Sequence, residues 1–494
     1  MRPFSFWINL KNKRYIGYST TALFILFLTI SILSGCTNTP GEPPSNSLAP
    51  TMPHPSATPS LTHQPLSRSS GPYLLIQSDL KQYQIIDLTT KKLSPFNPPG
   101  NVGQNNLSKL QSPSGQLIFF PLDDNKIVVT NLVTGQIIEI HGLSNKEEKF
   151  RTDLAVAEAQ SILEEDQYSV ESLTSMVEDA YQKSLSDIRW YENDQYLLLP
   201  RVSNATSTNL ALFDLETKSI TSLENQPGLV LDYRVGTNKD QILIKKGYAN
   251  DPLLWRGIRY YVLDVNSLSI EPIPLPKNID NPTLFWLQDR TIGIIHQMAP
   301  IGGIDFSILD LNNGGTKQII KGAFNHVSLY NGAIFWLKGS EIEEITTVGL
   351  SNLQAETLHQ RAIDQRCSYK TKLDNLILLN CETNSLFLNE DIEVIPFGPA
   401  VRLLVTAIGS EDAVLVTRDE EVFLLNKNTL ERDPLTLVGT PLEIRWLKDG
   451  SAFLYRVSGH LYIYNLESQE SRLLLDSQIL GDYTNINAIW IKVE

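Results

Sequence analysis

Residues 444–475 read IRWLKDGSAFLYRVSGHLYIYNLESQESRLLL. The stretch contains four short segments that alternate or run apolar, and the turn Lys448-Asp449-Gly450 separates the first two. Such segments of about four to eight residues predict strands, and Asp-Gly between two of them predicts a hairpin. The third segment ends at Asn465, and the fourth follows a polar turn. The stretch therefore predicts a unit of four antiparallel strands.

The same order of features recurs, and each third segment ends in an anchor of an aliphatic or aromatic residue, Asp or Asn, and Leu or Val, with Thr130 and Lys427 as departures. Seven anchors are clear: Ile86-Asp87-Leu88, Thr130-Asn131-Leu132, Phe213-Asp214-Leu215, Leu263-Asp264-Val265, Leu309-Asp310-Leu311, Leu425-Asn426-Lys427 and Tyr464-Asn465-Leu466. Two weaker ones, Val348-Gly349-Leu350 and Leu388-Asn389-Glu390, divide the interval from Asp310 to Asn426 into steps of 39, 40 and 37 residues. A repeat of about forty residues is the spacing of one propeller blade, so nine units are indicated.

The unit resembles the TolB-like and WD40-like bacterial propeller repeats, in which an aromatic residue, a polar Asp-Gly turn and an apolar strand precede a strand ending in Asp. Residues 112–119 (SPSGQLIF) and 446–450 (WLKDG) match best, and the pattern departs at Gly349, Asn389 and Asp289-Arg290. The resemblance implies an all-β fold, with a β-propeller of four-stranded blades over residues 72–494. Because propellers usually have about four to eight blades, we expect eight or nine.

The two ends of the repeat region complement each other. The segment 73–76 (YLLI) opens the repeats without a preceding strand, and the segment 486–491 (INAIWI) follows the last anchor. Pairing between them would complete the first sheet and leave no long open edge. We therefore expect a ring closed by the N- and C-terminal strands.

One interval breaks the period, because 83 residues separate Asn131 from Asp214. The interval is longer than one repeat, and we predict that the additional residues, 146–186, are helical. An earlier helix is predicted near residues 154–163, and apolar residues share one face of a later one: Val170, Leu173, Val177, Ala180, Tyr181 and Leu185. The interval predicts a helical hairpin inserted within the propeller, between its second and third blades.

The N-terminal region has the features of an export signal. Four basic residues precede an apolar stretch at 22–33, and Leu33-Ser34-Gly35-Cys36 resembles the bacterial lipobox. The resemblance implies a signal peptide at residues 1–35, acylation of Cys36, and a lipid anchor on the extracytoplasmic face of a bacterial cell membrane. The alternative is an uncleaved signal anchor, although the apolar core is short for a span of about 20 residues.

Residues 36–71 are rich in Pro, Ser and Thr, a composition that predicts a disordered tether. The formal net charge is -14, and removal of the four basic residues of the signal makes it -18. Counterion release from nucleic acid requires clustered Lys and Arg, and no basic run of that kind follows residue 36. We therefore expect no nucleic-acid partner.

With Cys36 acylated, Cys367 and Cys381 remain. Each is seven residues from Asp374, the centre of a polar turn, so a hairpin would place the two thiols opposite each other. A disulfide between them is the favoured interpretation in an oxidising compartment, and two buried free thiols are the alternative. A metal site is disfavoured, because no His or third Cys neighbours the pair.

No catalytic signature is present: the chain has no G-x-S-x-G elbow, H-E-x-x-H, Walker loop or C-x-x-C. We name no catalytic residue, metal ligand or cofactor, and an enzyme is the less favoured interpretation. The tryptophans are expected to pack between blades. Trp255 is the exception, because it falls in a long connection where loops often build binding surfaces.

These observations lead to a non-enzymatic cell-envelope lipoprotein whose propeller is a binding or scaffolding platform, with a protein partner that contacts the helical insertion. Two alternatives stay open. One is a carbohydrate-active or other hydrolase using loop carboxylates such as Asp251, Asp123 or Asp124, and the other is a receptor for a glycan or small ligand.

Overall fold

The structure is a computed structural model, and every residue that it describes belongs to the unit Pro59–Glu494. The signal peptide, Cys36, most of the tether and Trp255 lie outside the described residues. The described residues are 63, 65–66, 72–77, 83–98, 107–123, 126–141, 150–162, 169–192, 194–247, 258–275, 282–298, 303–320, 324–330, 333–341, 344–352, 354, 356–373, 376–382, 384–389, 391–406, 412–447, 450–477, 488–491 and 493.

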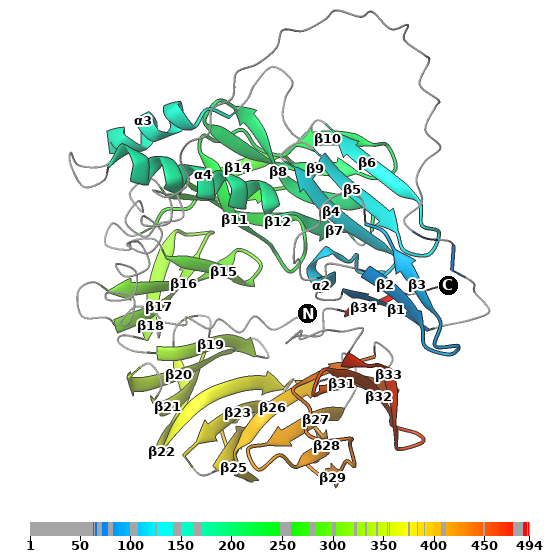
Figure 1. The fold of residues 1–494 in the computed structure, drawn as a ribbon. Helices are drawn as coiled ribbons and strands as arrows, with labels where there is room; N and C mark the ends of the chain where they lie inside the picture. Colours follow the sequence, from blue (N-terminus) through cyan, green and yellow to red (C-terminus); the bar gives the residue numbers. More distant parts are fainter. Residues whose placement is uncertain are drawn as a thin grey trace, which may run out of the picture. The chain divides into compact units, whose positions relative to one another are not determined.

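The described residues are mostly β-structure, arranged in antiparallel sheets that follow one another along the chain (Figure 1). Most sheets have four strands in a simple meander, the arrangement of a propeller blade. The first three sheets contain β1 (Tyr73–Gln77), β2 (Tyr83–Asp87), β3 (Leu93–Phe96) and β34 (Ala488–Ile491); β4 (Leu117–Asp123), β5 (Lys126–Asn131) and β6 (Ile137–His141); β7 (Arg189–Tyr191), β8 (Tyr196–Asn204), β9 (Ser207–Asp214) and β10 (Ser219–Ser222).

Two further four-stranded meanders follow in the middle of the chain, and two more near its C-terminal end. The middle pair contains β11 (Leu229–Val235), β12 (Gln241–Gly247), β13 (Arg259–Asp264) and β14 (Ser269–Pro272); β15 (Thr283–Gln288), β16 (Thr291–Met298), β17 (Gly303–Asp310) and β18 (Gly315–Ile320). The later pair contains β26 (Val401–Thr406), β27 (Asp412–Thr417), β28 (Val422–Asn426) and β29 (Arg432–Pro434); β30 (Glu443–Trp446), β31 (Ala452–Val457), β32 (His460–Asn465) and β33 (Glu470–Leu475).

Between these two pairs lies a seven-stranded sheet that joins two repeats. It contains β19 (Phe324–Tyr330), β20 (Ala333–Glu341), β21 (Glu344–Ser351), β22 (Thr357–Leu373), β23 (Leu376–Cys381), β24 (Asn384–Leu388) and β25 (Val394–Pro399). The 17-residue strand β22 pairs with β21 mainly through its first half and with β23 through its second half. One hydrogen-bonded sheet therefore contains two four-stranded repeats that share a strand.

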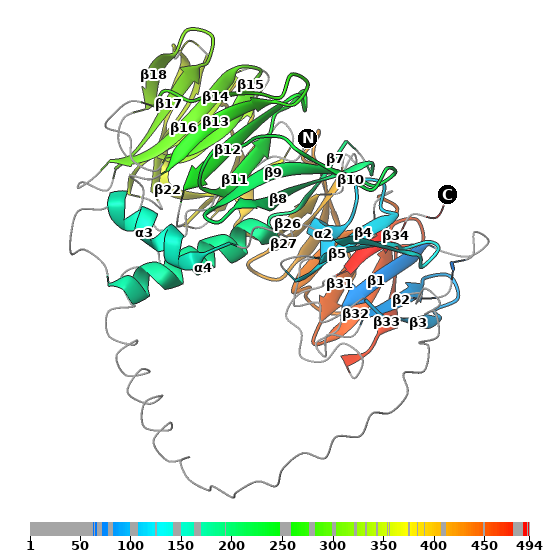
Figure 2. The ribbon, with the colours of Figure 1, turned by 90° about the horizontal axis from the view of Figure 1, so that it is seen from above.

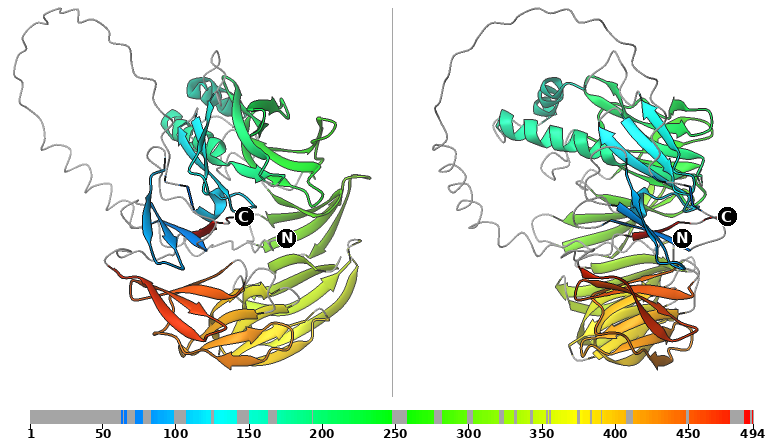
Figure 3. Two further views of the ribbon diagram at one scale, coloured as in Figure 1. Left: turned by 90° about the vertical axis from the view of Figure 1, so that its right-hand side faces the viewer. Right: turned by 45° about the vertical axis from the view of Figure 1, so that its right-hand side comes forward.

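The first sheet combines strands from both ends of the described chain. β34 pairs antiparallel with β1, with Tyr73 opposite Ile491 and Ile76 opposite Ala488. Figure 3 shows the red terminal strand beside the blue first strands. The sheet order β3-β2-β1-β34 therefore places the C-terminal strand in the position that the first strand has in other repeats.

The β4–β6 sheet departs from the predicted four strands. In place of a first strand it has the short helix α2 (Leu107–Leu110) and a single bridge between Gln111 and Ile118. The turn at Ser112-Pro113 follows at once, and proline has no N–H with which to extend a ladder. The first-strand pairing therefore stops after one residue.

The anchors of the repeat are explained by the turns that follow the third strands. In each turn the side-chain Oδ1 atom accepts a hydrogen bond from a backbone N–H two to four residues later, at 2.8–3.1 Å. Asp and Asn can both form this turn, which accounts for their alternation. The acceptors are Asp87, Asn131, Asp214, Asp264, Asp310, Asn352, Asn389, Asn426 and Asn465.

One predicted anchor is misplaced. Gly349 lies inside β21, where it faces the indole of Trp336, and Asn352 is the acceptor for the N–H groups of Gln354 and Glu356. The even spacing of 39 and 40 residues favoured Gly349, but a glycine has no side-chain oxygen with which to close the turn. Asn389, the other weak anchor, is in the predicted position.

Most of the core lies between consecutive sheets, because the side chains of each second strand alternate between the preceding and the following sheet. In β12, for example, Ile242 and Ile244 belong to a cluster with Leu198 and Leu210 of the preceding sheet. Leu243 belongs to a different cluster, which includes residues of the following β15–β18 sheet. Residues that are adjacent in a strand therefore serve two different interfaces.

Two helices occupy the interval of the predicted insertion: α3 (Thr152–Ile162) and α4 (Val170–Ser186). The Ser169 side chain caps α4 by accepting from the N–H of Ser172 at 3.2 Å. Ala155 of α3 and Val177 of α4 share an apolar cluster with Leu229 and Leu231, and Figure 2 shows α4 running beside the β8 and β11 strands. This cluster joins the helices to the β11–β14 sheet.

Part of the stretch predicted as tether packs against the sheets. His63 is buried, and Leu66 packs against the cluster that contains Phe96 and Leu132. The backbone N–H of Leu66 also donates to the carbonyl oxygen of Val133 at 2.8 Å. Composition alone did not distinguish these residues from their neighbours.

Candidate functional site

Tryptophans of the first strands connect consecutive sheets, as the sequence predicted for most of them. The indole Nε1 atom of Trp286 donates to the carbonyl oxygen of Arg234 at 2.9 Å, and that of Trp446 donates to Val405 at 2.8 Å. Trp190 donates to Leu110 at 2.8 Å. Each of these three acceptors belongs to the preceding sheet or to the segment in front of it.

Arginines in two of these strands, β7 and β30, connect their sheets to the following ones. Arg189 donates from Nη1 to the carbonyl oxygen of Tyr233 at 2.6 Å, and Arg445 donates from Nη1 to Ala488 at 3.2 Å. Each arginine is held by an acid two residues earlier, Asp187 or Glu443. The order acid-x-Arg-Trp at 187–190 and 443–446 is therefore a structural motif that fastens one sheet to both of its neighbours.

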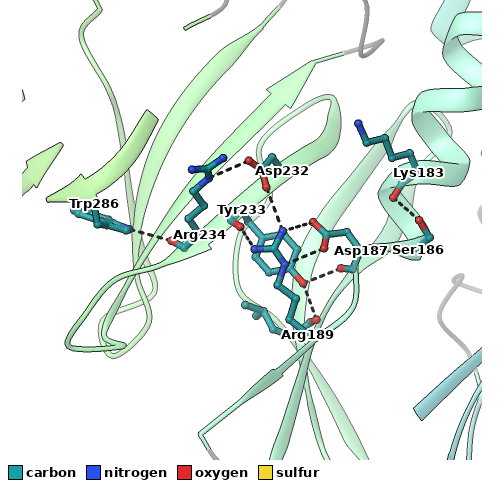
Figure 4. Close-up of polar contacts among 9 residues, drawn as sticks. Lys183, Ser186, Asp187, Arg189, Asp232, Tyr233, Arg234 and Trp286 are labelled. Atoms are coloured by element: carbon teal, nitrogen blue, oxygen red, sulfur yellow. Dashed lines mark hydrogen bonds and ion pairs between the residues drawn. The ribbon is translucent and has the colours of Figure 1, made fainter. Parts of the chain in front are cut away.

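A cluster of ionised side chains extends this motif between the β7–β10 and β11–β14 sheets (Figure 4). Arg189 contacts Asp187 with two nitrogens, at 2.9 and 2.8 Å, and contacts Asp232 at 3.2 Å. The other oxygen of Asp232 accepts from Nε of Arg234 at 3.2 Å. Asp232 therefore bridges two arginines and fixes the distance between them.

Tyr233 completes the cluster below Arg189. The guanidinium carbon of Arg189 lies 4.3 Å from the Tyr233 ring centroid, and the Tyr233 hydroxyl donates to the carbonyl oxygens of Asp187 and Leu198 at 2.7 and 3.0 Å. Burial raises the pKa of Tyr233 well above its usual value, with Asp187 adding to the effect. Burial opposes the charge of Arg189, but Tyr233, Asp187 and Asp232 together raise its pKa. Arg189 is thus a fixed cation.

A small pocket of about 50 Å³ adjoins this cluster, where the β11–β14 sheet meets the β15–β18 sheet. Arg234 and Lys245 bring two cationic side chains to its lining, and Asp232 brings one carboxylate. The complete lining is Asp232, Tyr233, Arg234, Leu243, Lys245, Tyr260, Pro282, Thr283 and Leu284. A hydrogen bond holds two of the lining residues together, because the Tyr260 hydroxyl donates to the carbonyl oxygen of Pro282 at 2.6 Å.

Lys245 is placed there by strand register. It is paired with Asp232 across β11 and β12, after a bulge that follows Val230. Burial lowers the pKa of Lys245; Asp232 opposes this effect, whereas Lys183 and Arg234 add to it. Strand register therefore places a lysine of lowered pKa in the pocket lining.

A buried cation, Lys246, lies on the opposite face of the same strand. The Nζ atom of Lys246 contacts both carboxylate oxygens of Glu224 at 3.0 and 3.1 Å and Oδ1 of Asn209 at 3.2 Å. Glu224 also accepts from the backbone N–H groups of Leu210 and Gln226. The charges of Lys246 and Glu224 balance each other, and both side chains have further hydrogen-bond partners. The pair therefore joins two sheets rather than binding a ligand.

The structure contains the disulfide that the sequence predicted. Cys367 and Cys381 form a disulfide between directly opposed residues of β22 and β23, with their Cα atoms 3.9 Å apart. This confirms the favoured interpretation of the two cysteines. Cys36 and Trp255, which were predicted as the lipidation site and a ligand contact, lie outside the described residues, as do Asp124 and Asp251. Asp123 ends β4.

The pocket was not anticipated from the sequence, because its charged residues match no known motif. Asp232 and Arg234 repeat the acid-x-Arg spacing of 187–189 and 443–445, and this recurrence is the signal that could have located it. Among the residues that the structure describes, no group of three His, Cys, Asp or Glu side chains is placed to hold a metal ion. Within the same residues, no helix has the length and apolar character needed to cross a membrane.

No protein-family model matches the chain, and no curated protein matches it. The fold is similar to β-propeller proteins among solved structures. One is a eukaryotic initiation factor, with 10% identity over 85% of this chain and 98% of that chain and a TM-score of 0.49. Dipeptidyl peptidase 4 of Porphyromonas gingivalis has 8% identity over 75% of this chain and 59% of that chain, with a TM-score of 0.45. Another solved structure to which this chain is similar is the dihydro-heme d1 dehydrogenase NirN, with 12% identity over 83% of this chain and 74% of that chain and a TM-score of 0.40. Likenesses this distant carry no inference about function.

Proposed function

We propose that this chain is a bacterial cell-envelope lipoprotein, anchored through acylated Cys36, whose β-propeller is a non-enzymatic platform for a protein partner. In this proposal the propeller has nine repeats, or eight blades if the seven-stranded sheet counts as one, and pairing of β34 with β1 closes the ring. All the repeats have four strands except the three-stranded β4–β6 sheet. The helices α3 and α4 form the hairpin inserted between its second and third sheets.

The observation that carries the proposal is the repeated fastening of consecutive sheets. Trp446 donates a side-chain hydrogen bond to the preceding sheet, and Trp190 donates one to α2 in front of the preceding sheet. Arg189 and Arg445 donate to the following sheets, so these bonds together resist displacement of one sheet against the next. Binding surfaces on rigid scaffolds lose little conformational entropy when a partner docks. Stiffness of this kind supports a platform.

The helices are the expected contact. They are attached to the scaffold through Leu229 and Leu231, yet they expose Leu154 and Val170, with 39% and 57% of their surface accessible. In this proposal Leu154 and Val170 are the apolar side chains that the partner would cover. The opposite faces of α3 and α4, which pack on β11, are not available to a partner.

The test is affinity capture from detergent-solubilised membranes with the full-length chain and its variants. Leu154→Asp combined with Val170→Asp is expected to remove the specific partner, whereas the matched control Leu442→Asp, at an exposed position before β30, is expected to retain it. Identical partner sets for all three proteins would exclude the helices as the contact. A Cys36→Ser variant is expected to lose lipid labelling; retained labelling would contradict the anchor.

A further inference from the structure

We propose that Lys370, Arg402 and Arg418 form a binding site for a phosphate group. The site lies where the repeat that contains β22–β25 packs against the β26–β29 sheet (Figure 1). It includes no residue of α3 or α4, so it goes beyond the proposed platform function and does not depend on it. The ligand would be inorganic phosphate or the phosphate group of a larger molecule.

Hydrogen bonds hold the two repeats together at this point. Asn380, near the end of β23, donates from Nδ2 to the carbonyl oxygen of Val401 at 2.6 Å and accepts from its N–H at 3.2 Å. The backbone N–H of Arg418 donates to the carbonyl oxygen of Ala400 at 2.9 Å. Its Nη1 atom lies 3.5 Å from the carbonyl oxygen of Glu382, in the turn after β23. Arg418 therefore connects the start of β26 to the end of β23.

The other two cations are bulge residues. The register of β22 against β23 shifts between Tyr369 and Thr371, which leaves Lys370 without a residue opposite it in the ladder. The register of β26 against β27 shifts in the same way around Arg402. A β-bulge changes the direction of a side chain, and bulges are common beside functional sites. Consecutive repeats therefore each have a cation at a bulge of their first strand.

The structure provides no carboxylate that neutralises this group. Among the residues that it describes, none of the three cations forms an ion pair. Arg402 donates from Nη2 to the carbonyl oxygen of Pro441 at 2.7 Å, and its Nε atom is buried without a hydrogen-bond partner. The arginines of the acid-x-Arg motif make a similar bond but have a carboxylate two residues earlier, whereas Arg402 has Ala400 there. Arg402 therefore lacks the carboxylate that compensates those arginines.

The three cations lie close enough together to affect one another. Burial lowers the pKa of Lys370, and the charges of Arg418 and Arg402 lower it further. Lys370 and Arg402 are partly buried, where salt screens charges less than it does at an exposed surface. An anion held among the three side chains would relieve this repulsion and favour the protonated form of Lys370.

The number and kind of the cations favour phosphate over carboxylate. A phosphate monoester carries about −1.5 to −2 charges at pH 7 and offers three acceptor oxygens. This matches three cationic side chains better than the single charge of a carboxylate does. Each arginine presents planar pairs of N–H groups that fit two phosphate oxygens, and Lys370 adds a point charge. The group also contrasts with the formal net charge of the chain, which is -14.

The test is isothermal titration calorimetry of the full-length protein in non-ionic detergent and a phosphate-free buffer of low ionic strength. Inorganic phosphate, glycerol 3-phosphate and dimethyl phosphate represent a free anion, a monoester and a diester, and acetate and glycerol are the carboxylate and neutral controls. At least one phosphate probe is expected to bind about tenfold or more tightly than both controls, and the preferred probe identifies the source. Acetate binding as tightly as the best phosphate probe would overturn the proposal, as would the absence of binding by all three phosphate probes.

Variants locate the site. Lys370→Met and Arg418→Gln are each expected to weaken the best phosphate probe about tenfold or more, and Lys370→Arg is expected to retain binding because it keeps the charge. The matched control is Arg472→Gln, which removes one exposed cation from β33. Unchanged affinity in Lys370→Met, or an equal loss in Arg472→Gln, would overturn the assignment.

Thermal unfolding followed by circular dichroism separates lost binding from lost folding. In phosphate-free buffer the midpoint of Lys370→Met is expected to equal or exceed that of the wild type, because the substitution removes a cation that two arginines repel. Addition of the best phosphate probe is expected to raise the midpoint of the wild type and to leave that of Lys370→Met unchanged. A lower midpoint of the variant without phosphate, or an equal rise in both proteins, would contradict the site.

Discussion

The indole nitrogen of Trp490 donates a hydrogen bond to the carbonyl oxygen of Trp446 at 3.1 Å. Trp446 is in β30 and Trp490 is in β34, the strand that completes the first sheet. The carbonyl oxygen of Trp490 accepts in turn from the side-chain amide of Gln111. The C-terminal strand is thus held by the sheets on both sides as well as by its ladder with β1.

This relationship predicts the effect of Trp490→Phe. The variant keeps an aromatic ring but removes the donor, which leaves the Trp446 carbonyl oxygen without this partner. We expect a loss of about 1–2 kcal/mol in the free energy of unfolding, measured by urea denaturation followed by tryptophan fluorescence and circular dichroism. An unchanged transition midpoint would contradict a role for this bond.

The turn acceptors are tested at Asn426. Its Oδ1 atom accepts from the N–H groups of Asn428 and Thr429, both at 3.0 Å. Asn426→Ala removes both bonds and is expected to destabilise the protein by about 1 kcal/mol. Asn426→Asp is the matched control, because Asp has the same role in other repeats; it is expected to stay within about 0.5 kcal/mol of the wild type at pH 7. Equal losses in both variants would contradict the acceptor role.

Acid sensitivity provides a related test. The backbone N–H groups of Thr217 and Ser267 lower the pKa values of Asp214 and Asp264 below the usual 3.8. A carboxylate with a lowered pKa contributes stability above its unfolded-state pKa, and this contribution is lost as the pH falls through the folded-state pKa. The Asp214→Asn, Asp264→Asn variant keeps two neutral acceptors. We expect its thermal midpoint to fall less than that of the wild type between pH 7 and pH 3; parallel curves would contradict this account.

A positive φ recurs at the position four residues after the anchors. Leu268 has φ 54° and half of its surface is exposed, although Gly135 and Gly314 serve the same position in other repeats. A left-handed conformation costs an L-residue about 1–2 kcal/mol, and glycine avoids this cost. Glycine also makes the unfolded chain more flexible, which offsets part of the gain, so Leu268→Gly is expected to raise the free energy of unfolding by up to about 1 kcal/mol. The control Leu442→Gly, at an exposed residue without positive φ, is expected to lower it. Destabilisation by both would contradict the strain.

The disulfide encloses a short segment of β22 and β23, with a sequence separation of 14 residues. Loop-closure entropy predicts a stabilisation of about 2–4 kcal/mol for a loop of this size. The Cys367→Ala, Cys381→Ala variant is expected to lose this amount in urea denaturation. Reducing agent should destabilise the wild type by a similar amount and leave the variant unchanged, and a reductant-sensitive variant would contradict the assignment.

The sequence predicted the repeated four-stranded units because their determinants are local. Alternation defines the strands, and each Asp or Asn closes its own turn, as Asp87 and Asn465 do. The error at Gly349 has the same origin, since spacing was followed where the chemistry of the turn required Asn352. The extra length between Asn131 and Asp214 likewise predicted helix from its own periodicity.

The candidate site could not be predicted in the same way. Lys245 lies opposite Asp232 only because a bulge shifts the register of β11 against β12, and a bulge is not visible in alternation. Arg189 reaches Asp232 across 43 residues, and Pro282 enters the pocket lining from the following sheet. Such contacts are set by how sheets stack, which no single segment encodes.

The pairing of β34 with β1 has a consequence for biosynthesis. Translation delivers β1 long before the strand that will cover its edge, so a nascent chain carries an unfinished sheet throughout its synthesis. A ribosome that stalls late, or a nonsense mutation shortly before codon 488, would release a polypeptide in which nearly every repeat is intact but β1 has an unpaired edge that can aggregate with other chains. Quality control in the cell would therefore have to act on molecules that are almost complete.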